Sequence, residues 1–384
     1  MDLRESAGES EFRGALRSWL DRSLPPDWGA AGPDPRREDP AFLRDWSRLL
    51  FEAGYTGLTW PAAYGGRGLP YAYEAVFREE TALAEAPEHI GVIGLGMVGP
   101  TIIAHGTEAQ RTTYLASILS GDTVFCQGFS ETEAGSDLAA VRCRARPRGD
   151  AFVVDGHKLW SSYAHLADHC LLLARTDPDS SGHNGLTCLL VDLRRPGVRV
   201  RPLRQITGGT TFNEISFDGV EVPRDAVLGG IGDGWRIAMT TLGHERGLLG
   251  FTLVARMDAM LRRLVTTMGA SGAAGDPVLR DRLAGVYVDL QGLRFTNYRL
   301  AGGDAPPGPE TSVAKLRWAE TNQRLAALAV EVLGPAAALD ADGWWRGYWP
   351  RERLRSRGNS IEGGTSEVLR SVLAERVLGL PRSR

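Results

Sequence analysis

The sequence predicts an α+β protein that is mostly helical, with a β-rich segment between two helical parts. Apolar residues recur at helical spacing up to about residue 122. From Thr123 the apolar period shortens toward that of a strand, and helical spacing returns after residue 230. We therefore expect an N-terminal helical domain over 1–122, a β-domain over 123–230 and a C-terminal helical domain over 231–384.

The composition is that of an ordinary globular protein. Hydrophobic residues make up 43% and charged residues 24% of 384 positions, and the net charge is −3. This charge predicts neither a nucleic acid nor an anionic membrane as partner, and no apolar run reaches the ~18 residues that span a bilayer. Four cysteines without CxxC spacing predict no disulfide framework and no metal site. We expect a cytoplasmic protein.

The first helical part contains several amphipathic helices. Two apolar stripes mark its first helices, Phe12, Leu16, Trp19 and Leu20, then Phe42, Trp46, Leu49, Leu50 and Ala53. Further helices are expected over 73–84, 92–104 and 108–119. The Pro- and Gly-rich segment 25–40 and the glycine turn 64–68 are expected to be loops.

The middle part consists of many short strand candidates. They cover 123–127, 141–145, 152–154, 170–174, 187–191, 198–202, 214–220 and 227–228. Turn-rich segments such as 147–150 and 180–185 separate them. Short strands at this spacing predict a sandwich or a barrel.

The last part contains four long helix candidates. They cover 235–268, 280–301, 312–333 and 365–378, with connectors over 304–309 and 334–343. Four long helices with short connectors predict a bundle.

Two neighbouring stretches have the residue types of a ligand site. The run Phe125–Asp137 changes from apolar residues to small and hydroxyl residues, a turn composition that leaves N–H groups and Ser hydroxyls free. The run Gly156–Ser162 then places Trp160 beside two serines. A flat, partly polar ligand suits this pair of stretches, with Trp160 for its ring face and Ser130 and Ser162 for its heteroatoms. The alternative is a β-rich domain with ordinary Ser/Gly turns.

The order of these residues resembles the acyl-CoA dehydrogenase family. The motifs are Ser-Glu-x-x-Ala-Gly-Ser-Asp from Ser130, Gly-x-Lys-x-Trp-x-Ser from Gly156, and Leu-Ala-Arg-Thr-Asp from Leu173. The resemblance runs nearly end to end, from Trp60-Pro61 to Glu375-Arg376-Val377-Leu378-Gly379. It implies an N-terminal helical domain, a middle β-barrel or sandwich and a C-terminal four-helix bundle.

The resemblance also implies a reaction. Acyl-CoA dehydrogenases bind FAD and convert an acyl-CoA thioester to the trans-2-enoyl-CoA. A base takes the α proton, hydride passes from Cβ to N5 of the flavin, and an electron-transfer flavoprotein or similar acceptor reoxidises the cofactor. Because the α proton is weakly acidic, such a site must stabilise the developing enolate and hold the basic carboxylate in a dry pocket.

Glu245 is the first candidate for the base. This carboxylate follows Leu242 by one helical turn and precedes Leu248 and Leu249 by another. An acid inside an apolar stripe costs free energy unless it has a partner or a function. Periodicity alone also allows an exposed glutamate at the edge of the stripe. The resemblance favours the base, since His244-Glu245-Arg246 matches the position where a bacterial branch carries its catalytic glutamate on this helix.

Glu362 is the second candidate. Many family members carry the base in a Tyr-Glu-Gly-Thr loop, which here reads Ile361-Glu362-Gly363-Gly364-Thr365. Aligning Gly364-Thr365 with that Gly-Thr places Gly363 at the position of the base, so Glu362 falls one residue early. The resemblance still implies that the Gly363 N–H binds the thioester oxygen, together with a ribityl hydroxyl of FAD.

The remaining site residues come from the resemblance alone. Flavin contacts are implied at Phe129, Ser130, Ser136, Trp160, Ser162, Gly364, Thr365, Ser366 and Glu367. Contacts to the CoA thioester are implied at Ser136 and Arg246.

One departure from the family bears on assembly. Homotetrameric members carry an Arg-x-x-Phe motif and a Gln-x-x-Gly-Gly-x-Gly-Tyr motif, which bind the adenine half of a neighbour's FAD. The matching segments here, 268–277 and 332–337, contain no Arg and no Gln. We therefore expect a homo- or hetero-oligomer, dimer or tetramer, with a related but distinct subunit favoured for the missing residues.

Three functional alternatives remain open from the sequence. The chain could be a dehydrogenase acting on a carrier-protein-bound acyl group, a catalytically silent FAD-binding subunit of a heteromer, or an oxidase or hydroxylase that uses dioxygen. The acyl group is not encoded in any motif, so chain length, branching and a steroid side chain all remain open.

Overall fold

The described residues, 5–28, 35–301, 308–338 and 344–381, fall into two units in this computed structural model. Side chains of residues 35, 245–249, 301, 338 and 344–346 lie outside the description. The sheet unit comprises Glu38–Gly68 and Glu88–Glu245, and the helical unit comprises Met1–Arg37, Leu69–Pro87 and Arg246–Arg384. Helix α6 (Gly234–Ser271) contributes residues to both units.

The sheet unit is built on one eight-stranded sheet. Its strands are β1 (Phe125–Gly128), β2 (Arg144–Arg148), β3 (Ala151–Ser162), β4 (His169–Arg175), β5 (Leu186–Asp192), β6 (Val198–Leu203), β7 (Phe212–Pro223) and β8 (Val227–Leu228). The order is β6-β7-β3-β2-β4-β5-β8, and β1 pairs in parallel with β4. The two longest strands, β3 and β7, pair antiparallel.

Strand β4 shows why this sheet is buried on both faces. Leu171 and Leu173 belong to one apolar cluster, whereas Cys170, Leu172 and Ala174 belong to another. Successive side chains of a strand point to opposite faces, so a continuous apolar run fills both cores. The first cluster includes α4 and α5 side chains, and the second includes Phe152 and Val154 of β3.

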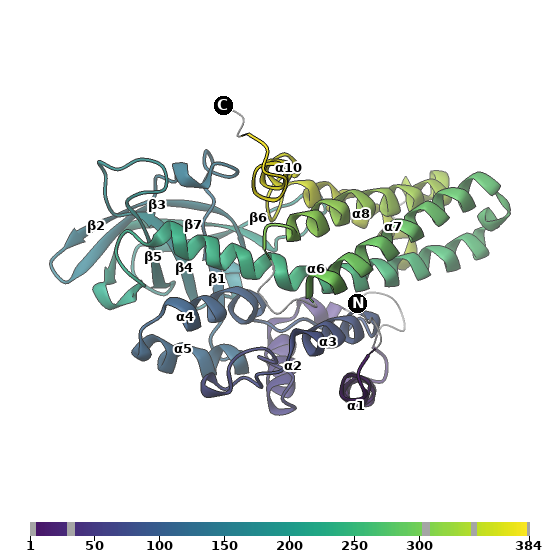
Figure 1. Cartoon of the computed structure of the whole chain (residues 1–384), viewed down its shortest axis with the longest axis horizontal. Coiled ribbons are helices and arrows are strands. Elements are labelled where there is room, and N and C mark those ends of the chain that lie inside the picture. Colours follow the sequence, from purple (N-terminus) through teal and green to yellow (C-terminus); the bar gives the residue numbers. More distant parts are fainter. Residues whose placement is uncertain (1–4, 29–34, 302–307, 339–343, 382–384) are drawn as a thin grey trace. The chain divides into compact units, whose positions relative to one another are not determined.

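Three helices complete the sheet unit besides the start of α6: α2 (Pro40–Glu52), α4 (Gly99–His105) and α5 (Glu108–Ser120). Helix α5 begins with a capping box between Thr107 and Gln110 and ends at Gly121 in the left-handed conformation. Helices α4 and α5 cover one face of the strands, and their Ile102 and Ile118 are fully buried there (Figure 1). A π-helix, Gly94–Val98, leads directly into α4.

The helical unit contains α1 (Ala7–Ser23), α3 (Tyr71–Leu83), α7 (Pro277–Ala301), α8 (Thr311–Leu333), α9 (Trp344–Arg355) and α10 (Ser366–Val372), with the later turns of α6. Figure 1 shows α7 and α8 running side by side. Their buried faces share a core with α6 through residues such as Leu264, Leu290 and Leu325. Helix α1 is joined to α3 by Arg13, which forms ion pairs with Glu79 and Glu80.

The predicted fold class is confirmed, and several element bounds are corrected. Strand β2 begins three residues after the predicted start at Val141, because the N–H groups of Arg142 and Cys143 bind the Glu131 carboxylate and not a neighbouring strand. Strand β3 is much longer than the predicted 152–154, and the helix over Trp344–Arg355 was not predicted. The predicted domain boundaries after residues 122 and 230 stay a prediction.

Three further features concern partners and cofactors. Within the described ranges, no helix combines the length and apolarity needed to cross a membrane. The same residues contain no cluster of three His, Cys, Asp or Glu side chains suited to a metal ion. All four cysteines are buried and free.

Candidate functional site

Trp160 is the most unusual residue of the sheet unit. Its side chain is 59% exposed although it lies in the middle of a paired strand region. Its φ of 60° is left-handed, a conformation that costs a non-glycine residue roughly 1–2 kcal/mol. The β3–β7 pairing shifts register between Lys158 and Ser161, so a bulge turns the indole out of the sheet. Strained, exposed aromatic residues of this kind are typical of ligand sites.

The loop that follows β1 lies directly against this part of β3. Leu159 N–H donates to the Ser130 carbonyl over 2.9 Å. The Lys158 ammonium donates to the Phe129 carbonyl over 2.9 Å and to Glu131 Oε1 over 2.7 Å. Three consecutive loop residues are thus tied to the strand that carries Trp160.

Glu131 is the centre of this connection. Its carboxylate also accepts the N–H groups of Arg142 and Cys143, at 2.7 and 2.9 Å. A half-buried carboxylate with these partners holds both ends of the Ser130–Val141 loop. The sequence analysis did not single out Lys158 or Glu131. Both residues lie in the two adjacent motifs, and the chain has only two lysines, so these observations could have identified them.

The predicted polar contacts of this loop are available to a ligand. Within the described residues, the hydroxyls of Ser130, Ser136 and Ser162 form no hydrogen bond, and none of the three side chains is buried. The Ser161 hydroxyl, in contrast, is buried without a partner. The ring of Phe129 is buried in the core, so only its backbone is available to a ligand at this loop. Free hydroxyls beside an exposed indole fit a flat ring with polar edges, as the flavin of FAD is.

The helical unit holds the second predicted loop. Gly363 and Gly364 have φ angles of 62° and 99°, a conformation that disfavours any residue with a Cβ. Within the part of the chain that the structure describes, the Gly363 N–H has no hydrogen-bond partner. The Lys315 ammonium donates to the carbonyls of Asn359 and Gly364, at 2.8 and 2.7 Å. A free N–H on a fixed loop is the kind of donor that an oxyanion needs.

Glu362 is committed to protein partners in the same loop. Its two carboxylate oxygens accept from Arg355 at 3.1 and 2.7 Å, and Asn359 Nδ2 donates to Oε1 at 2.7 Å. Both carboxylate oxygens are thus occupied by a bidentate guanidinium, and one of them also by an amide. This geometry holds the loop together and disfavours Glu362 as the acceptor of a substrate proton.

The other predicted residues of this loop lie at the start of α10. Thr365 is its N-cap, and its Oγ1 accepts from Val368 N–H at 3.2 Å. Ser366 is buried and Glu367 is exposed in the first turn. Of these three side chains, Glu367 is thus exposed, Thr365 is half-buried and Ser366 is buried.

Glu245 and Arg246 lie in α6, and their side chains are outside the described residues. The neighbouring His244 is half-buried, and its pKa is lowered by burial and by the nearby His105.

Helix α6 is fixed against α4 within the sheet unit. Arg236 donates to His105 Nδ1 at 3.1 Å, and His105 Nε2 lies 2.9 Å from Thr240 Oγ1. At the next residue of α6, the buried hydroxyl of Thr241 lies 3.0 Å from that of Thr101. These contacts set the direction of the helix just before Glu245.

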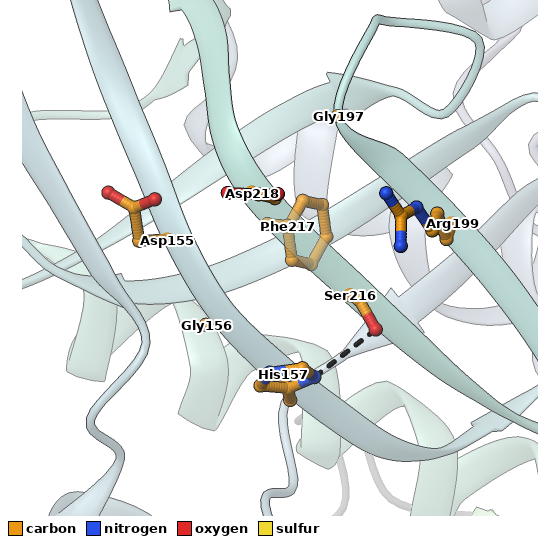
Figure 2. A pocket seen from close by; sticks show the side chains of 8 residues that line it. All are labelled: Asp155, Gly156, His157, Gly197, Arg199, Ser216, Phe217 and Asp218. Carbon is orange, nitrogen blue, oxygen red and sulfur yellow. Dashed lines mark hydrogen bonds between the residues drawn. The ribbon is translucent and has the colours of Figure 1, made fainter.

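A pocket of about 350 Å³ lies elsewhere on the sheet unit. It is lined by Asp155, Gly156, His157, Gly197, Arg199, Ser216, Phe217 and Asp218 (Figure 2). His157 Nδ1 lies 3.2 Å from Ser216 Oγ, and Asp155 Oδ1 accepts from Gly219 N–H at 2.8 Å. None of the predicted flavin residues lines this pocket.

Comparisons with known proteins identify the three domains of one enzyme family along the chain. The acyl-CoA dehydrogenase N-terminal domain matches residues 6–122, the middle domain 126–220 and the C-terminal domain 232–378. Acyl-CoA dehydrogenase IpdE1 of Mycobacterium tuberculosis is 42% identical, over 97% of this chain and 98% of that protein. Its counterpart in Mycolicibacterium smegmatis is 41% identical, over 97% of this chain and 98% of that protein.

Solved structures show the same architecture. The structure of "Tcur3481-Tcur3483 steroid ACAD" has a TM-score of 0.88 at 33% identity, covering 100% of both chains. The ChsE4-ChsE5 complex from Mycobacterium tuberculosis has a TM-score of 0.87 at 29% identity, covering 100% of both chains. The chain belongs to the acyl-CoA dehydrogenase family of FAD-dependent oxidoreductases.

Proposed function

We propose that the chain oxidises an acyl-CoA thioester to the trans-2-enoyl thioester, with Glu245 as the base. The observation that carries this proposal is the exposed, left-handed Trp160 beside the free hydroxyls of Ser130 and Ser162. Those three residues would hold the ring system of FAD, with Ser136 beside them. Gly364, Thr365, Ser366 and Glu367 would hold its ribityl and phosphate region.

In this proposal, each group of the protein has a separate role in the reaction. Bound FAD supplies the acceptor for the hydride that leaves Cβ. The Gly363 N–H donates to the thioester oxygen, which stabilises the negative charge that develops as the α proton leaves. The Glu245 carboxylate takes that proton, and Arg246 and Ser136 bind the CoA thioester. Glu362, paired with Arg355, keeps the Gly363 loop in place.

A steroid-derived acyl group is the substrate class that we propose. This chain shares 33% identity over its full length with a structure described as a steroid ACAD. The test below also compares the other acyl groups that the sequence leaves open.

A related but distinct subunit is the partner that we propose. The Tcur3481-Tcur3483 and ChsE4-ChsE5 structures each combine two differently named polypeptides. This chain lacks an Arg and a Gln in the segments 268–277 and 332–337. A heterotetramer would supply these residues from the partner.

The test is anaerobic reduction of the flavin by thioesters of different acyl groups. We expect bleaching of the flavin absorbance by a CoA thioester with a steroid-derived side chain, faster than by straight-chain acyl-CoAs. Reoxidation by an electron-transfer flavoprotein, but slowly by air, identifies a dehydrogenase and opposes an oxidase. If no thioester bleaches the flavin of the assembled protein, the silent-subunit alternative replaces this proposal.

A further inference from the structure

The chain's lysines are placed in an unusual way. Of 44 basic residues, only Lys158 and Lys315 are lysine. Each of them donates hydrogen bonds to one of the two loops to which we assign cofactor binding. The rest of the surface uses arginine, so lysine at these positions calls for a physical reason.

Lys158 is fully buried, with 0% of its side chain exposed. Its ammonium lies between the Phe129 carbonyl at 2.9 Å and Glu131 Oε1 at 2.7 Å. The residues that follow it on β3 are Leu159, which binds the Ser130 carbonyl, and the strained Trp160. The buried ion pair thus fixes the loop that carries Ser130 against the strand that carries the exposed indole.

Lys315 does the same in the helical unit. From α8 it reaches the carbonyls of Asn359 and Gly364, which lie on either side of Gly363. Helix α8 reaches this loop at two further points, since Asn322 donates to Asn359 Oδ1 at 2.8 Å and Gln323 to the Ser356 carbonyl at 3.0 Å. Of these hydrogen bonds, only the one from Lys315 to Gly364 holds a residue that follows Gly363 in the chain. That bond therefore sets the direction of the free Gly363 N–H.

The chemistry of the ammonium group explains the choice of lysine. A compact ammonium has three donors around one atom and can bind two or three oxygens that converge on a point. A planar guanidinium spreads five donors over a wider fork and needs more space. In a site as closed as that of Lys158, the guanidinium of an arginine would displace the loop.

We propose that Lys158 and Lys315 are positioning residues for the cofactor, each fixing one of its two binding loops. Neither residue contacts the reacting atoms in this proposal. Lys158 acts through Phe129, Ser130 and Glu131, and Lys315 acts through the Gly363–Gly364 turn. The inference rests on the proposed function, because it takes these loops to be the FAD contacts.

The test compares methionine and arginine variants in the assembled holoenzyme and in its apoprotein. We expect K158M and K315M to weaken FAD binding at least ~10-fold, the scale of one lost charge-assisted hydrogen bond. The visible flavin spectrum should also change, because the ring environment loosens. K315R should retain part of the affinity, since Lys315 is only partly buried, whereas K158R should not.

Controls separate positioning from a general loss of stability. V222A removes volume from a fully buried position on β7, outside both loops, and should lower thermal stability without changing FAD affinity or spectrum. If K158M fails to fold, the variant K158M/E131Q removes both charges and keeps a side-chain oxygen that can accept from the Arg142 and Cys143 N–H groups. It should show the same loss of FAD affinity.

The outcomes distinguish this inference from the proposed function. If S130A and W160A weaken FAD binding but the folded K158M and K315M variants match the parent in affinity and spectrum, the lysine inference is overturned. If S130A and W160A also leave FAD binding unchanged, the assignment of the loops themselves is wrong. Equal losses in V222A and K158M would reduce Lys158 to a stabilising residue and overturn its positioning role.

Discussion

The segments matched to the two ends of the cofactor differ in what they offer a ligand. At the flavin end, Ser130 and Ser162 have free hydroxyls, and Trp160 is exposed at a cost in backbone strain. At the adenine end, the segments 268–277 and 332–337 are built of glycine, alanine and apolar residues. The residues at the flavin end leave side chains free to bind a ligand, whereas the residues at the adenine end pack within the helical bundle.

The few polar groups at the adenine end are used within their own turns. Asp276 Oδ1 accepts from Val278 N–H at 2.8 Å and caps α7. Ser271 Oγ donates to the Met268 carbonyl at 3.3 Å and accepts from Ala273 N–H at 3.4 Å. Ala273 and Leu333 pack against the core of the bundle. These packed segments support the proposal that a different subunit binds the adenine half of the cofactor.

The largest effect is expected from the base at the flavin end. E245Q keeps the size of the side chain and removes its ability to accept a proton. We expect flavin reduction by substrate to slow at least ~10²-fold, the usual scale for a lost general base. FAD content should stay unchanged. Anaerobic stopped-flow reduction of the flavin measures the rate.

The matched control is E362Q, which has the same chemical change in the neighbouring loop candidate. Because Glu362 is paired with Arg355 and Asn359, E362Q should loosen the Gly363 loop and slow reduction by less than E245Q does. An active E245Q beside an inactive E362Q would transfer the role of base to Glu362.

The next largest effect concerns the adenine end. If this chain supplies only flavin-side contacts, then the protein purified alone should bind FMN nearly as well as FAD, within about tenfold. A full site with two added hydrogen-bond donors should prefer FAD by a further ~10–100-fold, since a typical hydrogen bond contributes ~0.5–1.5 kcal/mol. Quenching of flavin fluorescence on titration of the apoprotein gives both affinities.

The same preparation tests the heteromer directly. We expect the chain expressed alone to be poorly soluble or deficient in FAD, with the C-terminal helices still allowing self-association. Native mass and flavin content decide this. A stable homomer with one FAD per chain, full turnover and a strong preference for FAD over FMN would contradict the heteromer.

Hydrophobic periodicity was sufficient to predict most of this fold. The long helices α7 and α8 begin within three residues of their predicted starts and end where predicted, because continuous apolar stripes define them. Strand β3 was underestimated, since its pairing shifts register at Gly156 and again before Ser161, and such bulges break the period of a strand. Helix α9 was missed because Pro350 and glycine interrupt its pattern.

The site was predicted less completely than the fold. Family motifs indicated Ser130 and Trp160. The left-handed backbone conformation of Trp160 could not be predicted from the sequence, because it depends on the β3–β7 register. Likewise, the engagement of Glu362 depends on Arg355 lying two helical turns earlier on a helix that the sequence analysis did not predict. Long-range pairing of this kind is set by the folded chain.

A smaller effect is expected from the indole itself. W160A should weaken FAD binding roughly 10-fold and shift the visible flavin absorbance, because a ring stack of this kind contributes ~0.5–1.5 kcal/mol beyond area burial. W160F keeps an aromatic face and should recover part of the affinity. An unchanged spectrum and cofactor occupancy in W160A would show that Trp160 is not a flavin contact.

The smallest effect isolates the backbone strain from the cofactor. At a φ of 60°, alanine retains a cost of ~1–2 kcal/mol that glycine does not have. Glycine loses ~0.4–1 kcal/mol through the greater entropy of its unfolded chain. The strain is the larger of the two, so apo-W160G should be more stable than apo-W160A by about 0.5–1 kcal/mol in urea unfolding. Leu159 provides the matched control, because its backbone lies outside the left-handed region and L159G should be less stable than L159A. If glycine is the less stable residue at both positions, then the left-handed Trp160 is not a source of strain, and its exposure alone would have to account for the flavin end.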